Sequence, residues 1–231
     1  MSRPESHPLA TTRPVLSRER VIAAGVELVD EGGAEALTMR AVAQRLGSGV
    51  MSLYRHVSGR EELLDLVVAA MAADVRRTAL LGDWRQDLAA LARDVRAGLL
   101  RRPHLTVLLT SRAGRGGAEV SMLERTLGIL RDAGFSPEEA VRANHALGNY
   151  VAGAALWEAV GMAGTTGAER TARLEATADA LAALPPDRFP NLTWVGRSLI
   201  TGTLDERFEF GLRALIDGFE RALERGPDTE G

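Results

Sequence analysis

Apolar residues recur at helical spacing along almost the whole of this chain. In residues 17–33 they fall at every third or fourth position and form one stripe, which ends at Gly32 and Gly33. Stretches of Val, Ile, Thr and Tyr that alternate with polar residues would predict strands, and no such stretch occurs. Aromatic residues make up only 4% of the chain. The pattern therefore predicts an all-α protein.

Start and stop signals divide this pattern into separate helices. Ser17 and Thr38 precede the first two helices as N-caps, and four later helices each follow a capping box, in which Ser or Thr precedes Glu by three residues. The four boxes lie at residues 58/61, 136/139, 166/169 and 203/206. Pro185 to Gly202 lacks a helical pattern, so we expect a long loop there. The expected helices span about residues 17–33, 38–46, 50–56, 58–81, 83–101, 104–111, 119–133, 136–162, 166–184 and 203 onward.

The composition narrows the classes of protein that this chain can belong to. Its 231 residues include no cysteine, which excludes disulfides, thiolate metal sites and cysteine nucleophiles. The N-terminus lacks the apolar segment of a secretory signal, and the most apolar stretch, residues 63–73, is far shorter than the roughly 20 residues of a membrane span. We therefore expect a soluble, cytoplasmic protein that begins with a disordered arm, residues 1–16.

Charge is distributed unevenly between the two ends of the chain. The net charge is −3, but residues 1–60 hold eight Arg against six acids, whereas residues 61–231 hold twenty Arg against twenty-five acids. No acid occurs between Ala36 and Arg60, a stretch that we call the basic segment. Such a segment on an acidic chain suits phosphate contact at one end only, although a solvated basic face would have the same composition.

The basic segment contains two short helices joined by a glycine turn. Residues 37–64 read LTMRAVAQRLGSGVMSLYRHVSGREELL, in which the turn is Gly47-Ser48-Gly49 and Val42, Leu46 and Leu53 point inward. This is the pattern of a helix-turn-helix, whose first helix crosses the DNA backbone and whose second helix lies in the major groove. The segment predicts a DNA-binding head.

The same segment resembles the DNA-binding head of the TetR family, which is named for the tetracycline repressor. The resemblance rests on LT-x-R-x-x-A-Q-x-LG, on SLYRHV and on the charged turn with ELL that follows. Further along, Gly134-Phe135-Ser136 and the closing FEFGLRALIDGFE are similar to the tetracycline-repressor-type C-terminal domain. In all, the resemblance covers about residues 17–225.

The resemblance implies a three-helix helix-turn-helix domain at residues 17–62 and a helical bundle at residues 63–231 for effector binding and dimerisation. It implies a transcriptional regulator, a repressor that a small-molecule effector releases from double-stranded operator DNA. An activator with the same architecture stays open. The helix expected at residues 58–81 would join the head to the bundle and carry the effector signal.

Carried over position by position, the resemblance implies two sets of DNA contacts. Many relatives have a polar residue and a proline where this chain has Gly49-Val50-Met51, so the base sequence stays open. Tyr54 could instead be a core aromatic and His56 a helix C-cap, and we expect Arg45 to be a solvated surface residue. Base contacts are implied for Arg40, Val50, Met51, Ser52 and Arg55, and phosphate contacts for Thr38, Ser48, Tyr54, His56 and Arg60.

The resemblance also implies an effector site that is mostly apolar. Any one of its residues could equally be ordinary core. Leu108 falls where the tetracycline repressor has a histidine that binds the magnesium of the drug, so the sequence does not favour a magnesium–tetracycline effector. The implied site comprises Arg76, Leu91, Val95, Leu108, Met122, Leu123, Thr126, Leu127, Val141, Asn144, His145 and Gly148.

In the family, two late helices pair with their copies across a two-fold axis. Here these are the helices expected at residues 136–162 and from residue 203, and packing within one chain is the alternative. The small residues Gly148, Ala152 and Ala155 would permit close approach, and an apolar stripe on the last helix would contribute area. That stripe consists of Phe208, Leu212, Leu215 and Phe219.

A helical enzyme or a ligand carrier is the competing class. The sequence has no nucleophile elbow, no phosphate-binding loop and no CxxC motif, and its four histidines show no metal-ligand spacing. We therefore expect neither enzymatic activity nor a cofactor nor a metal site.

Overall fold

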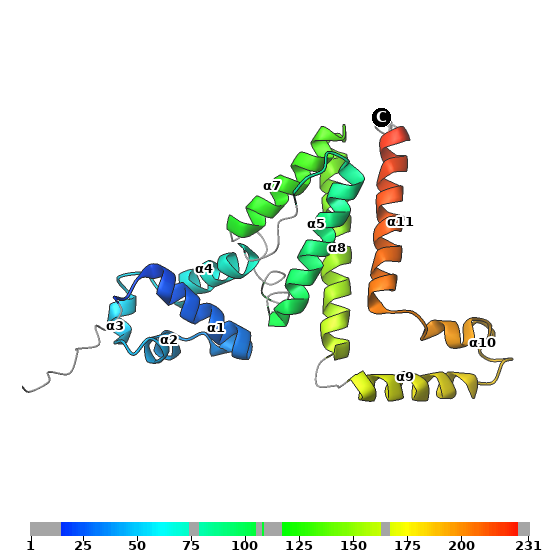
Figure 1. Ribbon diagram of the computed structural model, residues 1–231, viewed down its shortest axis with the longest axis horizontal. Coiled ribbons are helices and arrows are strands. Elements are labelled where there is room, and N and C mark those ends of the chain that lie inside the picture. The colour runs from blue at the N-terminus through cyan, green and yellow to red at the C-terminus, as the bar shows by residue number, and fades with distance from the viewer. Residues whose placement is uncertain (1–14, 74–78, 105–107, 109–116, 163–166, 226–231) are drawn as a thin grey trace, which may run out of the picture. The chain divides into compact units, whose positions relative to one another are not determined.

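The computed structural model describes residues 15–73, 79–104, 108, 117–162 and 167–225 (Figure 1). All regular elements in these ranges are helices, which confirms the all-α prediction. The chain divides into two compact units, one up to Ala70 and the other from Met71 onward. The expected arm falls almost wholly outside the described ranges, and Arg76 lies outside them too.

The first unit contains α1 (Arg18–Ala36), α2 (Met39–Arg45), α3 (Val50–Leu53) and most of α4 (Arg60–Ala73). Both predicted N-caps are confirmed, because the side chain of Ser17 accepts from the amide of Arg20 at 3.3 Å and that of Thr38 accepts from Ala41 at 3.1 Å. The core of the unit is made of aliphatic side chains from all four helices and from the link between α1 and α2, including Val21, Val29, Leu37, Val42, Leu53, Leu63 and Val67.

Two glycines interrupt the end of α1. Gly32 and Gly33 leave the helical conformation, and Gly33 adopts a φ of 68°, a region that residues with a Cβ rarely occupy. The helix thus breaks where the sequence predicts its end, and one more helical turn leads to Leu37. We call residues 34–37 the α1–α2 corner.

The second unit contains α5 (Trp84–Arg101), α7 (Gly117–Asp132), α8 (Pro137–Met162) and α11 (Leu204–Arg225) as its main helices. Figure 1 shows α8 alongside both α5 and α11, and α7 packs against α5 and α8. The amphipathic α11 buries Phe208, Leu212 and Ile216 in this bundle. The predicted capping boxes at residues 136/139 and 203/206 are both formed.

Between α8 and α11 the chain forms three further elements, namely α9 (Gly167–Ala182), α10 (Pro190–Val195) and the 3₁₀ helix η1 (Gly196–Leu199). These three elements make their most extensive contacts with one another, and most of their side chains are exposed. The prediction of a long loop from Pro185 to Gly202 is wrong, because a helix begins within this range and Pro190 is its first residue.

The helix expected at residues 58–81 does not reach Leu81. Its described part is α4, Arg60–Ala73, and residues 79–81 are not helical. The buried carboxylate of Asp87 accepts from the amides of Leu81 at 2.7 Å and Gly82 at 3.0 Å, and so holds this segment as a turn before α5. At the other end of α4, the partner of Ser58 is Glu62 rather than Glu61.

Candidate nucleic-acid interface and ligand site

The helix-turn-helix is built from α2, the turn of residues 46–49 and α3. Gly47 adopts a φ of +61°, so a glycine is required where the chain reverses between the two helices. Val42 and Leu53 are fully buried and hold the two helices together. This packing leaves the other faces of α2 and α3 to solvent.

The side chains that could read bases lie on those solvent faces. Met51 is 77% exposed, and Arg40 and Arg55 are exposed as well. Neither guanidinium forms an ion pair with any described residue, so both are available to an external acceptor. Val50 and Ser52 are half-buried beside them.

The residues expected at phosphates differ more among themselves. Thr38 and Tyr54 are exposed, and at 46% exposure Tyr54 is not a core aromatic. His56 is half-buried in the turn after α3. The hydroxyl oxygen of Ser48 is buried and has no hydrogen-bond partner among the described residues, and Arg60 donates its hydrogen bonds within the head.

Arg45 forms ion pairs with two glutamates of the neighbouring helix α1. Its guanidinium bonds both carboxylate oxygens of Glu31, at 3.0 and 2.6 Å, and one oxygen of Glu27 at 3.1 Å. The hydrogen bond from Arg45 is the main reason why the pKa of Glu31 is lowered. Arg45 therefore fastens α2 to α1 on the surface of the head.

Most of the residues expected around an effector come from α5, α7 and α8, three helices that pack on one another, whereas Leu108 lies between α5 and α7. Arg76 lies outside the described residues. The others differ in exposure: Leu91, Leu108 and Thr126 are buried, Val95, Met122, Leu127 and Asn144 are half-buried, and Leu123, Val141, His145 and Gly148 are exposed.

The exposed members on α8 belong to one stripe. Val141, His145 and Gly148 are followed at helical spacing by the half-buried Ala152 and the exposed Leu156. This stripe faces away from the bundle of the same chain. Ala155, in contrast, is 1% exposed and packs inside that bundle.

The apolar side of α11 also divides in two. Phe208 and Leu212 are 2% and 1% exposed, so they belong to the core of their own chain rather than to a surface stripe. Leu215 and Phe219 are half-buried, and Phe210 is 75% exposed. The expectation that all four stripe residues face a partner is therefore wrong for the first two, because the turns of α11 that carry them pack on α5 and α8.

A cavity of about 570 Å³ lies where the end of α8 meets α9 and the start of α11. Its apolar wall is formed by Leu100, Trp157, Leu174 and Leu204, and its polar wall includes Glu158 and Asp205. It contains none of the twelve residues expected to bind an effector. Within the described residues, no cluster of three or more His, Asp or Glu could hold a metal ion.

Two family models match the chain. The model of bacterial regulatory proteins of the tetR family matches residues 21–67, and that of the tetracyclin repressor-like C-terminal domain matches residues 80–223. The chain belongs to the TetR family. It is thus a DNA-binding transcriptional regulator with an N-terminal helix-turn-helix.

Individual TetR-family proteins are similar over nearly the whole length. The transcriptional repressor DrrR1 of Streptomyces coeruleorubidus is 35% identical, over 90% of this chain and 78% of its own. The class G tetracycline repressor of Vibrio anguillarum is 33% identical, over 89% and 94%. The crystal structure of ActR from Streptomyces coelicolor in complex with actinorhodin has a TM-score of 0.77 at 30% identity, over 90% of this chain and 98% of that one.

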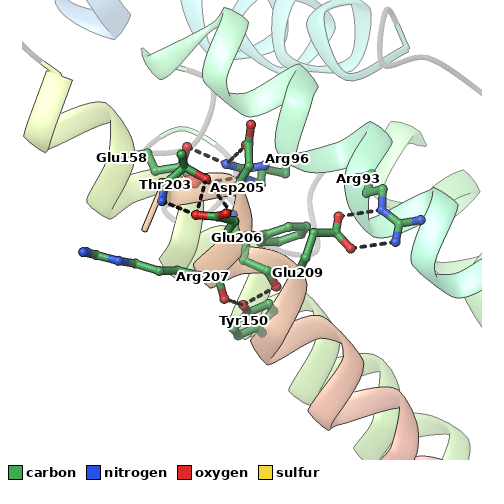
Figure 2. A network of polar contacts seen from close by, with 10 residues as sticks. Arg93, Arg96, Tyr150, Glu158, Thr203, Asp205, Glu206, Arg207 and Glu209 are labelled. Atoms are coloured by element: carbon green, nitrogen blue, oxygen red, sulfur yellow. Dashed lines mark hydrogen bonds and ion pairs between the residues drawn. The ribbon is translucent and has the colours of Figure 1, made fainter. Parts of the chain in front are cut away.

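This TetR-family bundle has a buried ionic centre that sequence reasoning missed. Arg96 on α5 bonds both carboxylate oxygens of Glu158 on α8, at 2.7 and 2.8 Å, and one oxygen of Asp205 on α11 at 2.6 Å (Figure 2). The guanidinium also lies over the ring of Phe208, 4.5 Å from its centroid. Burial lowers the pKa of Arg96, but the hydrogen bonds that its guanidinium donates to the two carboxylates outweigh this, so the net pKa is raised.

A signal for this centre is present in the sequence. Glu158 is the only acid in α8 after its first turn, and it stands among Ala, Leu, Trp and Val. A lone acid in an apolar stretch is rarely buried without a cationic partner. The partner, however, lies 62 residues away on another helix, and spacing along the chain does not reveal it.

Within the described residues, no helix is long and apolar enough to cross a membrane.

Proposed function

We propose that this chain is a repressor that binds operator DNA through α2 and α3 and leaves it when a small molecule binds the second unit. The observation that supports this most directly is the solvent face of the helix-turn-helix, where Arg40, Met51 and Arg55 stand exposed without partners in the described chain. The proposed action is binding rather than catalysis, and it takes place on cytoplasmic DNA.

Repression and release are inferred from relatives together with this architecture. DrrR1 is named a transcriptional repressor, and ActR was crystallised with a small molecule, actinorhodin. The candidate ligand-binding residues lie mainly on α5, α7 and α8, which pack on one another, and among them Leu91 and Thr126 are buried and Asn144 is half-buried.

The DNA roles proposed here divide the head into two groups. Arg40, Val50, Met51, Ser52 and Arg55 contact bases, whereas Thr38, Tyr54 and His56 contact phosphates. Ser48 is left out of the second group because its hydroxyl oxygen is buried. Phosphate contacts contribute affinity without sequence information, and base contacts contribute the difference between operator and random DNA.

The test compares Tyr54→Phe, Tyr54→Ala and Arg55→Ala on the DNA upstream of the gene and on random DNA of the same length. Both Tyr54 variants should weaken binding to the two DNAs alike, since a phosphate contact is the same on any sequence. Arg55→Ala should weaken operator binding by about 1–3 kcal/mol more than random binding. Equal losses on both DNAs for all three variants would contradict the assignment of roles.

Release is tested by linkage. An effector that favours the state unable to bind DNA weakens operator binding by some factor. Linkage requires that operator DNA weaken effector binding by the same factor, commonly 5–150-fold (about 1–3 kcal/mol). Actinorhodin and tetracycline, the small molecules that the names of relatives contain, are the first probes. Calorimetry with and without operator decides, and a probe that binds equally in both titrations is not a releasing effector.

A further inference from the structure

Arg60, the first residue of α4, is bonded to the backbone of the preceding helices. Its Nε donates to the carbonyl oxygen of Leu37 at 2.8 Å, and its Nη2 donates to the carbonyl oxygen of Ala34 at 2.8 Å. Its Nη1 donates to the carboxylate of Glu61 at 3.0 Å. All three nitrogens of the guanidinium therefore have acceptors within the head.

The two carbonyls belong to the α1–α2 corner. The carbonyl of Ala34 also accepts from the amide of Leu37 at 3.2 Å, so Arg60 is its second donor, and this turn follows the break of the helix at Gly32 and Gly33. Leu37 is fully buried, and the next residue, Thr38, is the N-cap of α2. The position of the Leu37 carbonyl therefore determines where α2 begins.

The same turn of α4 also holds the beginning of α1. One carboxylate oxygen of Glu62 accepts from Arg18 at 2.7 Å, and the other accepts from the amide and hydroxyl of Ser58. Between these two attachments α4 lies directly on α1 at Gly25. The first turn of α4 thus contacts the start of α1 and the corner that follows its end.

We propose that Arg60 is a positioning residue for DNA recognition and not a phosphate ligand. Its planar fork spans two carbonyls and thereby fixes the start of α2 relative to α4, so that Arg40 and α3 are presented together. A lysine at this position would keep the charge but could not bond both carbonyls in that geometry. This inference rests on the DNA-binding role proposed above and replaces the phosphate contact expected for Arg60.

The experiment measures operator and random-DNA affinity against salt for Arg60→Lys, Arg60→Gln and the wild type. The matched control is Arg18→Lys, since Arg18 makes a single ion pair with the same α4 turn and lysine can make it too. We expect Arg60→Lys and Arg60→Gln to lose about tenfold in operator affinity, as for lost charged hydrogen bonds. Random-DNA affinity should fall much less than operator affinity, the salt slope should stay the same, and Arg18→Lys should match the wild type.

A phosphate contact gives the opposite result. Arg60→Lys would then keep operator affinity, and Arg60→Gln would reduce the slope of log affinity against log salt by about 0.9 per head. Equal losses on operator and random DNA would reduce Arg60 to a role in folding. Either result overturns the proposal.

A second readout does not depend on DNA. Hydrogen exchange of the amides of Ala41 and Val42, the first bonded amides of α2, should be faster in Arg60→Lys and unchanged in Arg18→Lys. Unchanged exchange in Arg60→Lys would overturn the positioning role. A third outcome separates the two proposals. If the wild type shows no preference for its upstream DNA, but exchange is still faster in Arg60→Lys, the proposed function is refuted and Arg60 only holds the α1–α2 corner in place.

Discussion

Gly25 lies at the closest approach of α1 and α4 in the head. A Cβ built at this position would be 2.6 Å from Cγ2 of Val67 and 3.3 Å from Cδ1 of Leu37. Both neighbours are short, buried aliphatic side chains with little freedom to move. Any side chain at this position therefore forces the two helices apart within the hydrophobic core of the head.

We expect Gly25→Ala to destabilise the head by about 0.5–2 kcal/mol. Overpacking a core costs about 1–3 kcal/mol, and the better helix propensity of alanine returns at most about 1 kcal/mol. Hydrogen exchange of the α1 amides measures the effect in the first unit alone. The matched control is Gly128→Ala in α7, where a Cβ meets nothing within 4 Å and the substitution should stabilise its helix. A Gly25→Ala head as stable as the wild type would mean that α1 and α4 are not this close.

Among elements, α5 and α11 are joined by a ladder of arginine–carboxylate pairs. Arg85 bonds Glu220, Arg93 bonds both oxygens of Glu209, and Arg96 bonds Asp205. The residue numbers rise on α5 as they fall on α11, as expected for antiparallel helices. The ladder flanks the buried row of Phe208, Leu212 and Ile216, so α11 is held by an apolar centre with a charged edge.

This edge makes the bundle sensitive to acid. The hydrogen bonds from Arg93 hold the pKa of Glu209 below its ordinary value of 4.5. The unfolded chain therefore takes up a proton before the folded one does, so the contribution of the pair is complete above pH 4.5 and is lost as pH falls through the lowered pKa. Both side chains are partly solvated, which limits the contribution to about 0.5–1 kcal/mol.

We expect Glu209→Gln to be less stable than the wild type by that amount at pH 7, and the difference to shrink as pH falls from 4.5 through the lowered pKa of Glu209. Urea unfolding at a series of pH values measures it. Glu224→Gln on the same helix is the control, since Glu224 is exposed and pairs with no described residue. A difference between Glu209→Gln and the wild type that stays constant from pH 7 to pH 3 would contradict the role of the ion pair.

How far the sequence predicts an element depends on the range of the interactions that end it. The caps of Ser17, Thr38, Ser136 and Thr203 act within three residues, and all of them form as predicted. The end of the helix expected at Leu81 was predicted wrongly because the carboxylate of Asp87 holds the turn from inside the next helix. The buried pair of Arg96 and Glu158 lies beyond local patterns for the same reason.

At the DNA site, residue type and helical register predict which side chains are exposed, as for Arg40, Met51 and Arg55. They do not predict that Arg60 turns toward two backbone carbonyls, because a broken helix end creates those acceptors. In the effector site, periodicity alone does not separate the two faces of α8, both of which are apolar. Val141 and Leu147 both fit a core pattern, yet only Leu147 is buried.

For the whole molecule, the exposed stripe of α8 has the composition of a helix–helix interface. Val141 and Leu156 are 46% and 45% exposed at its ends, with Gly148 and Ala152 between them. Small residues flanked by large apolar ones let two helices approach closely across a two-fold axis. We propose that this stripe, together with the solvent side of α11, forms a homodimer interface that sets the spacing of the two heads.

The double variant Val141→Arg, Leu156→Arg should be monomeric in sedimentation, because it would bury unpaired charge in that interface. Its own fold should survive, since both side chains already face solvent in one chain. Val120→Arg with Leu123→Arg makes the matching change on α7, at 64% and 43% exposure, and should stay dimeric. Loss of the dimer in both variants, or in neither, would place the interface elsewhere.

The three tryptophans of the chain, Trp84, Trp157 and Trp194, all belong to the second unit. Trp84 packs edge-on against Phe135. Trp157, near the end of α8, is 81% exposed, and Trp194, on α10, is 85% exposed. Tryptophan fluorescence therefore reports on the second unit alone, because the head contains no tryptophan. Emission from the two exposed indoles reports whether anything, a ligand or a second copy, has covered that end of the bundle. It can be followed without attaching a dye.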